Sequence, residues 1–308
     1  MRYAVIGTGA IGGYYGAMLA RAGSEVHFLL HSDYDYVLEH GLHIDSFRGP
    51  FSIDRPNVYR SAADMPVCDI VLVGLKTTNN RLLPGLLAPV AGPHTLVLLI
   101  QNGIGVEADV EAAVPGAQLA AGLAFICSAK TEPGRVRHTS NGSINIGNYS
   151  CREPRLLDAL MADFGAAGVR AAMVDYDEAR WKKAMWNMPF NGLSVALNAT
   201  TDRLIAPGPA ARLVSALMDE VSGAAAACGV TAADRAFADK MVEMTRRMPP
   251  YAPSMKLDYD YRRPMEIYYL YTRPIEEARR RGFEMPRMAM LEELLRFAEE
   301  RRKQDGRS

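Results

Sequence analysis

The chain lacks several features that would assign it at once to a class of protein. Lys and Arg together number 35, as do Asp and Glu, so the formal net charge is zero. Such a balance argues against nucleic acid or an acidic membrane surface as the main partner. The longest apolar run, at residues 96–100, is far too short to cross a bilayer. We therefore expect no nucleic-acid partner and no membrane partner.

Cysteines and metal-ligand patterns are equally sparse. The 308 residues include four cysteines without paired spacing: Cys68, Cys127, Cys151 and Cys228. Free thiols in a reducing compartment are the expected state of such cysteines. No cluster of His, Cys and Asp has metal-ligand spacing, so we predict no metal site. Because a strand-forming run begins at Tyr3, we also expect no targeting segment and a cytoplasmic location.

The first sixteen residues carry the clearest motif that is present. A strand-forming run at 3–6 leads into a glycine turn and then a helical stretch, and the turn reads Gly7-Thr8-Gly9-Ala10-Ile11-Gly12. In this setting G-x-G-x-x-G is the fingerprint of a dinucleotide site. Gly7 permits the sharp turn, Gly9 lets a pyrophosphate approach the backbone, and Gly12 lets the helix pack close to the strand. The free N–H groups at the helix start then face the phosphates. These six residues are the predicted cofactor-binding turn.

The end of the second expected strand, at 25–30, bears on the choice of cofactor. An acid there would bond the ribose 2′-hydroxyl of NAD, whereas an Arg would accept the 2′-phosphate of NADP. This chain has His31 at the strand end, and a protonated His31 favours a phosphate. Asp33 is expected to cap the next helix rather than to read the ribose. The sequence therefore favours NADP(H), with His31 as a cofactor-binding residue.

Two further buried strands, at 69–75 and 95–100, are each followed by polar residues. Lys76 follows the first strand and Asn102 follows the second. Ligands of doubly wound sheets lie outside the carboxyl ends of the strands, so both side chains are placed to meet cofactor or substrate. The alternative is a solvated loop lysine and an ordinary Asn102-Gly103 turn. Their position at strand ends favours the functional interpretation.

The expected secondary structure changes near residue 175. Before it, strands are expected at 120–128, 135–139 and 143–146, with a hairpin corner at Gly49-Pro50 and a hairpin turn at Asn141-Gly142. After it, only helical stretches are expected, at 178–197, 210–228, 232–248, 265–281 and 287–302. We predict an α/β fold with an N-terminal Rossmann-type doubly wound parallel sheet over 1–174 and an all-helical C-terminal domain over 175–308.

Three polar residues recur within the first of these helices. Lys183, Asn187 and Asn191 are four residues apart, so they share one face of an otherwise apolar helix. An exposed polar stripe is the alternative. Asparagine is a poor helix former, however, and buried polar groups cost stability unless they are paired or used. Further along, Ser254 could be a helix N-cap and Glu266 a first-turn acid, and alone neither indicates more.

Taken together, these stretches resemble the ketopantoate reductase family, from Gly7 to about Ala298. The motifs appear in family order: Gly7 to Gly12, then Leu75-Lys76-Thr77, then Gln101-Asn102-Gly103-Ile104-Gly105, then Trp181, Lys183, Asn187 and Asn191, then Ser254-Met255 with Asp258, and Glu266. An ordered set of this kind is far more specific than any one motif.

The resemblance implies the reduction of the ketone of 2-dehydropantoate to pantoate, with hydride from NADPH, for coenzyme A synthesis. Lys183 looks like the family's catalytic lysine, which donates a proton to the carbonyl oxygen. A free lysine has a pKa near 10.4, so we expect its cationic form to dominate at pH 7. The remaining roles are likewise implied by the resemblance: Asn187, Asn191 and Ser254 bind the substrate's hydroxyl and carboxylate, Lys76 and Asn102 lie beside the nicotinamide with Asn102 also near substrate, Glu266 contacts the cofactor ribose as the domains close, and Ser128 makes another cofactor contact.

Two departures from the family pattern keep alternatives open. His31 stands where family members often have an NADP-reading arginine, and Thr201 replaces a further substrate asparagine, although Asn198 lies close by. A reductase of another branched 2-oxo acid is therefore the second hypothesis. A dinucleotide-binding sensor without catalysis is the third, and the intact set around Lys183 counts against it. The expected partner is a small 2-oxo acid, and a homodimer through the helical domain is compatible with the sequence.

Overall fold

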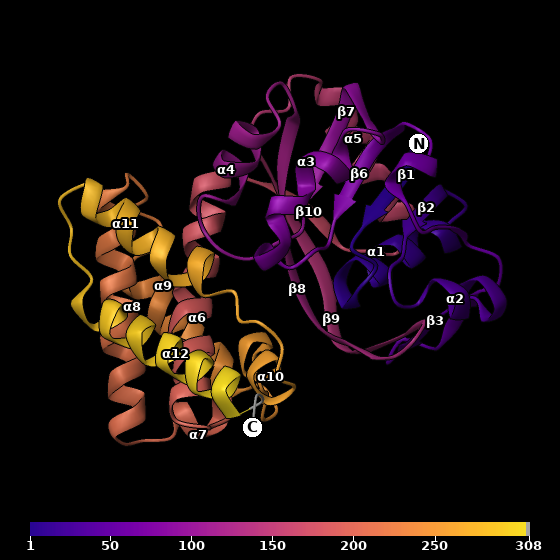
Figure 1. The fold of residues 1–308 in the computed structure, drawn as a ribbon. Helices are drawn as coiled ribbons and strands as arrows, with labels where there is room; N and C mark the ends of the chain where they lie inside the picture. The colour runs from indigo at the N-terminus through magenta and orange to yellow at the C-terminus, as the bar shows by residue number, and fades with distance from the viewer. Residues whose placement is uncertain (306–308) are drawn as a thin grey trace. The chain divides into compact units, whose positions relative to one another are not determined.

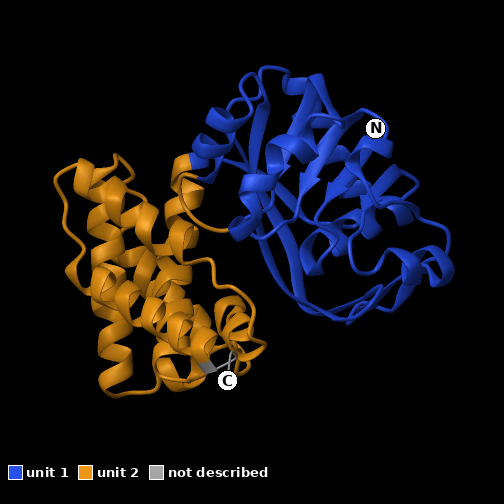
Figure 2. Ribbon diagram, in the orientation of Figure 1, with its two compact units in different colours: residues 1–101, 106–176 blue, residues 102–105, 177–308 orange. Residues whose placement is uncertain are grey.

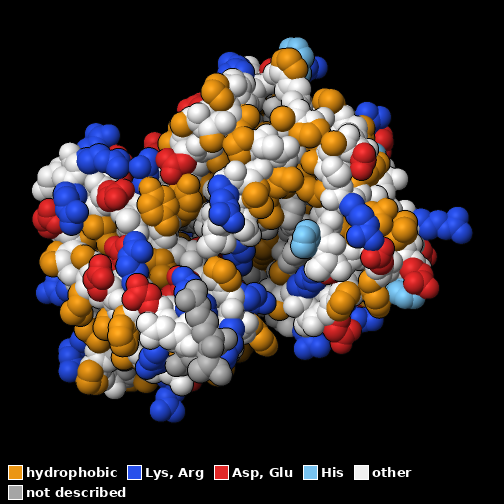
Figure 3. Space-filling view, in the orientation of Figure 1, with side chains coloured by type: hydrophobic (Ala, Val, Ile, Leu, Met, Phe, Trp, Pro, Cys, Tyr) orange, Lys and Arg blue, Asp and Glu red, His pale blue; other side chains and the backbone are white. Residues whose placement is uncertain are grey.

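The computed structural model describes residues 1–305, which fall into two compact units (Figure 2). The first unit comprises Met1–Gln101 and Val106–Tyr176, and the second comprises Asn102–Gly105 together with the chain from Asp177 onward. In the view of Figure 3, basic and acidic side chains are interspersed over both units, as a chain without net charge would lead one to expect.

The first unit is built on a ten-stranded sheet whose larger part is parallel (Figure 1). Across the sheet the parallel strands follow the order β5 (Asn57–Tyr59), β2 (Glu25–Leu29), β1 (Arg2–Ile6), β6 (Cys68–Val73), β7 (Ala91–Leu99) and β8 (Gln118–Glu132). Val5 pairs with Phe28 on one side and with Leu72 on the other, and all three are buried. The strand order reverses at β1 and β6, so the carboxyl ends of these two strands form the topological switch point at which such sheets bind ligands.

The helices of this unit connect the strands. They are α1 (Ala10–Arg21), α2 (Tyr34–His40), α3 (Leu83–Leu87), α4 (Val106–Ala113) and α5 (Pro154–Ala166), with short 3-10 turns at Ala62–Asp64 and Thr77–Leu82. The predicted Rossmann-type sheet followed by a helical region is confirmed.

The remaining strands make the sheet mixed rather than wholly parallel. They are β9 (Arg135–Asn148), antiparallel to β8; β3 (Leu42–Ser46) and β10 (Ala171–Val174), both parallel to β9; and β4 (Phe51–Ile53), antiparallel to β3. The β3–β4 pair confirms the hairpin corner predicted at Gly49-Pro50.

The hairpin turn predicted at Asn141-Gly142 is wrong. Strands β8 and β9 are joined near Gly134, and β9 runs unbroken through Asn141 and Gly142. Asn141 pairs with Ile126 and Ser143 with Phe125, so Gly142 is an extra residue in β9. Both Asn141 (φ 64°) and Gly142 (φ 104°) have positive φ. Positive φ serves a β-bulge as well as a turn, and the sequence alone does not separate the two.

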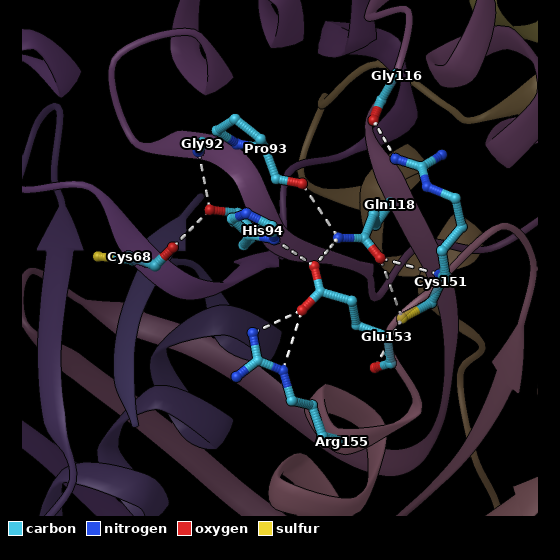
Figure 4. Close-up of polar contacts among 11 residues, drawn as sticks. Cys68, Gly92, Pro93, His94, Gly116, Gln118, Cys151, Glu153 and Arg155 are labelled. Carbon is cyan, nitrogen blue, oxygen red and sulfur yellow. Dashed lines mark hydrogen bonds and ion pairs between the residues drawn. The ribbon is translucent and has the colours of Figure 1, made fainter.

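A paired polar network lies at the amino ends of β6, β7 and β8, at the opposite edge from the switch point (Figure 4). Its centre is Glu153, whose carboxylate lies 2.7 Å from His94 Nδ1 and accepts hydrogen bonds from Gln118 Nε2 (3.0 Å) and Arg155 (2.6 Å). His94, Arg155 and Gln118 together lower the pKa of Glu153 to about 2. The network ties the start of β8 to the start of α5.

The second unit is helical around a core of its own. Its helices are α6 (Tyr176–Ala196), α7 (Thr201–Ile205), α8 (Pro209–Ala227), α9 (Arg235–Arg246), α10 (Ser254–Asp260), the π-helical turn η3 (Tyr268–Thr272), α11 (Arg273–Arg280) and α12 (Pro286–Asp305). Met185, Met188, Leu217 and Leu270 are buried in this core. The helix expected at 265–281 is present as one continuous helical stretch, in which the π-helical turn η3 is followed directly by α11.

Within residues 1–305, no helix is both long and apolar enough to cross a membrane. No group of three or more His, Cys, Asp or Glu side chains in this part of the chain is placed to hold a metal ion. None of the four cysteines forms a disulfide there.

Candidate active site

The glycine turn after β1 has the close contacts that its motif requires. Gly7 has φ +91°, and a Cβ there would lie 2.5 Å from the backbone nitrogen of Leu75, just beyond β6. A Cβ on Gly12 would lie 2.3 Å from the Gly7 carbonyl oxygen. Around Gly9, by contrast, a Cβ would meet no described atom within 4 Å. Gly7 and Gly12 are thus demanded by the fold, whereas Gly9 faces open space in which a dinucleotide could lie.

The start of α1 also suits an anion. Gly9 is the N-cap of α1, and no side chain caps this helix end. The N–H groups of a first helical turn have no partners within their helix, so they are suited to bind phosphate oxygens. Thr8 turns its hydroxyl away from this space and donates to the Leu29 carbonyl oxygen at 2.9 Å. The backbone here, rather than the Thr8 hydroxyl, fits a dinucleotide.

The residues after β2 differ in exposure. His31 is exposed, as a residue that meets a ligand from solvent would be. Asp33 holds the N-cap position of α2 but makes no side-chain cap bond. Its carboxylate is buried and instead lies 2.5 Å from Lys130 Nζ and accepts from the Gly134 N–H at 3.0 Å. The predicted capping bond is therefore absent, because the β8–β9 turn engages this carboxylate, and sequence reasoning missed Lys130.

The other predicted cofactor residues of the first unit lie in different settings. Lys76 is half-buried and directly precedes the 3-10 turn that begins at Thr77, beyond the carboxyl end of β6. The Gln101 side chain donates to the Leu75 carbonyl oxygen at 2.7 Å, which fixes the chain next to Lys76. Ser128 lies within β8, and its buried hydroxyl has no hydrogen-bond partner among the described residues. Gln101 is a supporting residue that the sequence analysis named within a motif but gave no role of its own.

The polar stripe of α6 is turned inward, not exposed. Lys183 is half-buried, while Asn187 and Asn191 are buried. A cavity of about 10 Å³, enough for about one water molecule, is lined by Gly103, Arg180, Lys183, Ala184, Asn187 and Leu270. The structure thus brings Lys183 and Asn187 to one small cavity. Arg180 and Gly103 were not predicted for it.

The amine of Lys183 has an unusual proton affinity. Burial, and next the positive charge of Arg180, lower the pKa of Lys183 to about 7, while Glu266 partly opposes them. This pKa lies well below that of a free lysine, from which a dominant ammonium form at pH 7 was expected. A pKa near the working pH suits a group that must both hold and release a proton.

The Asn191 side chain of α6 is hydrogen-bonded to the first residues of α10. The Asn191 Oδ1 accepts the Met255 N–H at 3.0 Å and faces the Ser254 hydroxyl at 3.5 Å. Two of the predicted substrate residues, Asn191 and Ser254, are therefore neighbours. Ser254 is not the N-cap of α10, which is Pro253, so its side chain is not used to cap that helix.

The turn η3 holds several of these parts in place. Glu266 is buried and lies just before it, and the Tyr269 carbonyl oxygen accepts the Ile104 N–H at 3.0 Å. A Cβ on Gly103 (φ +109°) would lie 2.5 Å from that same carbonyl oxygen. The segment 102–105, which includes the half-buried Asn102, therefore packs on η3 in the unit that carries Lys183. Only glycine fits at position 103.

Pro189 lies where α6 loses a regular hydrogen bond, as expected from the missing N–H. Tyr271 of η3 donates its buried hydroxyl to the Met188 carbonyl oxygen at 2.7 Å, and the Gly192 N–H also bonds this hydroxyl. The tyrosine hydroxyl thus lies in the backbone hydrogen-bond ladder of α6, between the Met188 carbonyl oxygen and the Gly192 N–H. Sequence reasoning missed it, because nothing local marks which tyrosine will reach a distant helix.

Thr201 and Asn198, the two residues considered in place of a further substrate asparagine, both have structural roles. Thr201 is buried; its N–H donates to the Tyr251 carbonyl oxygen (3.0 Å), and its hydroxyl accepts from the Tyr251 N–H (3.2 Å). Asn198 is exposed and has φ +49°, a conformation that suits the end of α6. Thr201 therefore anchors the segment that leads to α10.

Comparisons with known proteins agree with this geometry. Residues 3–150 match the family model described as "Ketopantoate reductase PanE/ApbA", and residues 175–299 match its C-terminal model. The chain belongs to the ketopantoate reductase family. It is 42 % identical to a 2-dehydropantoate 2-reductase of Nostoc sp. over 306 residues, which cover 97 % of this chain and 96 % of that protein.

Solved structures show the same architecture. A 2-dehydropantoate 2-reductase from Geobacter metallireducens has a TM-score of 0.93 at 38 % identity, covering 97 % of this chain and all of that one. A D-mandelate dehydrogenase solved with NADH and anilino(oxo)acetate shares the fold, with a TM-score of 0.90 at 23 % identity over 98 % of this chain and all of that one. The family resemblance inferred from the ordered motifs is thus confirmed.

Proposed function

We propose that this ketopantoate reductase family member reduces the ketone of 2-dehydropantoate to pantoate with NADPH. The observation that carries the proposal is the Lys183 amine, which shares an internal cavity with Asn187 and has a pKa of about 7. The similarity to the Nostoc reductase over nearly the whole chain supports the choice of substrate. We further propose residues 1–174 as the cofactor-binding domain and 175–308 as the substrate and catalytic domain.

In this proposal Lys183 is the catalytic residue. Its Nζ donates a hydrogen bond to the ketone oxygen and passes a proton to it as the carbon is reduced, which leaves a neutral amine. The bound reduced nicotinamide supplies the hydride. Glu266 attracts the ammonium form and so helps Lys183 to regain its proton from solvent.

The substrate-binding residues proposed beside Lys183 are amides and a hydroxyl, which suit a ligand rich in oxygen: Asn102, Asn187, Asn191 and Ser254. Burial excludes water around the two asparagines of α6, which strengthens each hydrogen bond that they make. The pairing of Asn191 with the start of α10 supports a fixed position for both Asn191 and Ser254.

The residues that we propose to bind the cofactor are Gly7, Thr8, Gly9, Ala10, Ile11, Gly12, His31, Lys76, Asn102, Ser128 and Glu266.

The glycine turn offers a matched pair of tests. Gly9→Ala meets no described atom, so we expect normal stability but NADPH binding weakened about tenfold or more, because the added methyl group enters the ligand's space. Gly12→Ala meets the Gly7 carbonyl oxygen, so we expect lost stability as well. Thermal melts with and without NADPH distinguish them, and equal NADPH stabilisation of Gly9→Ala and wild type would contradict the assignment.

A steady-state assay that follows the absorbance of the reduced nicotinamide tests the function. It compares NADPH and NADH with 2-dehydropantoate and with other branched 2-oxo acids. We expect the highest kcat/KM for 2-dehydropantoate with NADPH. A reductase of another branched 2-oxo acid is the second candidate, since Thr201 is held by Tyr251 where the family has a substrate asparagine. Higher kcat/KM for such an acid would replace 2-dehydropantoate, and NADPH binding without any turnover would favour the sensor.

We also propose a homodimer formed through the helical unit. Three apolar side chains recur at helical spacing on α12, and Met290, Leu294 and Phe297 are 58 %, 48 % and 62 % exposed. Such a stripe is typical of a protein–protein contact. Light scattering should give a dimer mass for the wild type and a monomer mass for Leu294→Glu/Phe297→Glu. A monomeric wild type would contradict this proposal.

A further inference from the structure

The cavity beside Lys183 contains a second basic side chain that the proposed reaction does not use. Arg180 precedes Lys183 by three residues on α6, so the two side chains lie on neighbouring parts of one helix face. Arg180 is only 3 % exposed, and it lines the same small cavity as Lys183 and Asn187. A guanidinium remains charged throughout the pH range of a working enzyme, so this position carries a fixed positive charge.

Two charged side chains, Arg180 and Glu266, act on the proton affinity of the Lys183 amine. Arg180 lies on the same helix and disfavours the ammonium form, whereas the buried Glu266, just before η3, favours it. The cavity residues from the segment 102–105 and from η3 are Gly103 and Leu270, which carry no charge. Besides burial, the Arg180 cation and the Glu266 carboxylate thus act on the amine with opposite signs.

We propose that Arg180 is a positioning residue for the reduction proposed above, on which this inference rests: its fixed charge makes Lys183 release the Nζ proton to the substrate oxygen more readily than an isolated lysine would. In that step an N–H bond of Lys183 breaks, and its electron pair stays on nitrogen. The proton forms the O–H bond of the product alcohol, while hydride from the reduced nicotinamide forms the C–H bond. A nearby cation favours the neutral amine that results.

The charge coupling can be measured without substrate or cofactor. Acetic anhydride acylates only neutral amines, and mass spectrometry of the peptide that contains Lys183 gives the rate at each pH. In the full-length protein we expect half-maximal reactivity near pH 7. Arg180→Gln should raise this midpoint by about one pH unit, as expected for a charge one helical turn away. Arg180→Lys keeps the charge and should leave the midpoint nearly unchanged, and Glu266→Gln should lower it.

Two measurements then decide the proposal. The proposal is overturned if Arg180→Gln has the wild-type circular dichroism spectrum and the wild-type labelling midpoint. This holds whether or not the enzyme reduces a 2-oxo acid. A raised midpoint together with an equal shift in the pH profile of kcat/KM supports it, and a raised midpoint with an unmoved profile breaks its link to the reaction. If no 2-oxo acid is reduced while the midpoint moves, the proposed function fails and the coupling of Arg180 to Lys183 stands. Arg180→Met, which keeps an unbranched stem, replaces Arg180→Gln if that variant does not fold.

Discussion

The network around Glu153 and the cavity around Lys183 both lower a pKa, with opposite consequences. Glu153 is surrounded by donors, and its lowered pKa means that the protein favours the charged carboxylate. Lys183 is half-buried near another cation, and its lowered pKa means that the protein disfavours the charged ammonium. A charge that is paired and hydrogen-bonded stabilises the fold. A charged form that the protein disfavours gives up its proton more readily, which is typical of catalytic groups. A lowered pKa therefore has opposite meanings for the two groups: it marks a stabilised charge at the Glu153 carboxylate and a destabilised charge at the Lys183 amine.

The two regions also lie in different structural settings. The Glu153 network lies at the amino ends of parallel strands, where strands and helices must be tied together. The Lys183 cavity is lined largely by α6, a helix that contains Pro189 and that is hydrogen-bonded to η3 through Tyr271 and to α10 through Ser254 and Met255. Variants in the first region should change stability, and variants in the second should change turnover.

The largest expected effect is that of Lys183→Ala. Loss of the proton donor should lower kcat by about a hundredfold or more, while NADPH still binds. Lys182→Ala is the matched control, because Lys182 pairs with Glu178 and lies over the ring of Phe237 instead of the cavity. Steady-state kinetics with NADPH titration checks both variants. Turnover of Lys183→Ala within a few-fold of wild type would remove Lys183 from the mechanism and erase the contrast.

The pH profile of the wild type sharpens the comparison. The proton donor must be protonated, and its pKa of about 7 means that the competent fraction declines above that pH. We expect kcat/KM, which reports the free enzyme, to be level below about pH 6 and to fall about tenfold per unit well above pH 8. A descending limb that begins near pH 10 would show that Lys183 behaves like a free lysine.

Glu153→Gln should lower the stability of the protein and leave kcat nearly unchanged, in contrast to Lys183→Ala. The pKa of Glu153 is lowered from 4.5 to about 2 in the folded protein, so its charge stabilises the fold above about pH 4.5, and this contribution is lost as the pH falls toward 2. The Tm of the variant should be lower than that of the wild type at pH 7, with the gap closing between pH 4.5 and 2. Glu39→Gln, at an exposed position, is the control. A gap that stays constant with pH would mean that the charge of Glu153 is not what matters.

The smallest effect is expected from His31→Arg. The side chain at position 31 is exposed, so a fixed charge there is screened by solvent and salt. It should raise the preference for NADPH over NADH only several-fold, through attraction of the 2′-phosphate. The ratio of kcat/KM for the two cofactors measures it, with His40→Arg as a control on α2. An unchanged ratio would show that position 31 does not read the ribose.

The sequence predicted those parts that depend on local pattern. The turn from Gly7 to Gly12 and the stripe of Lys183, Asn187 and Asn191 follow from spacing within one strand–turn–helix or one helix. In the structure the turn is tight at Gly7 and Gly12, and the three side chains of the stripe are buried or half-buried. The order of the motifs gave the family. In each case residues close in sequence carry the signal.

The parts that could not be predicted depend on contacts between distant segments. The positive φ values at Asn141 and Gly142 are typical of a turn, and only the pairing of β9 with β8 makes them a bulge. Asp33 was expected to cap a helix, but Lys130, distant in sequence, competes for its carboxylate. Likewise the influence of Arg180 on Lys183 appears only when both line one cavity, because a charged pair on a helix is ordinarily solvated.

The contact of Asn191 with α10 restricts what this side chain can offer a ligand. Its oxygen already accepts the Met255 N–H, which fixes the orientation of the whole amide. The amide therefore presents its NH₂ group, and no acceptor, to any molecule that approaches from its other side. A carboxylate, a ketone or an alcohol oxygen can take such a bond, and an ammonium group cannot. One backbone hydrogen bond to a neighbouring helix thus leaves an amide that could bond donors and acceptors alike with only its donor group to offer.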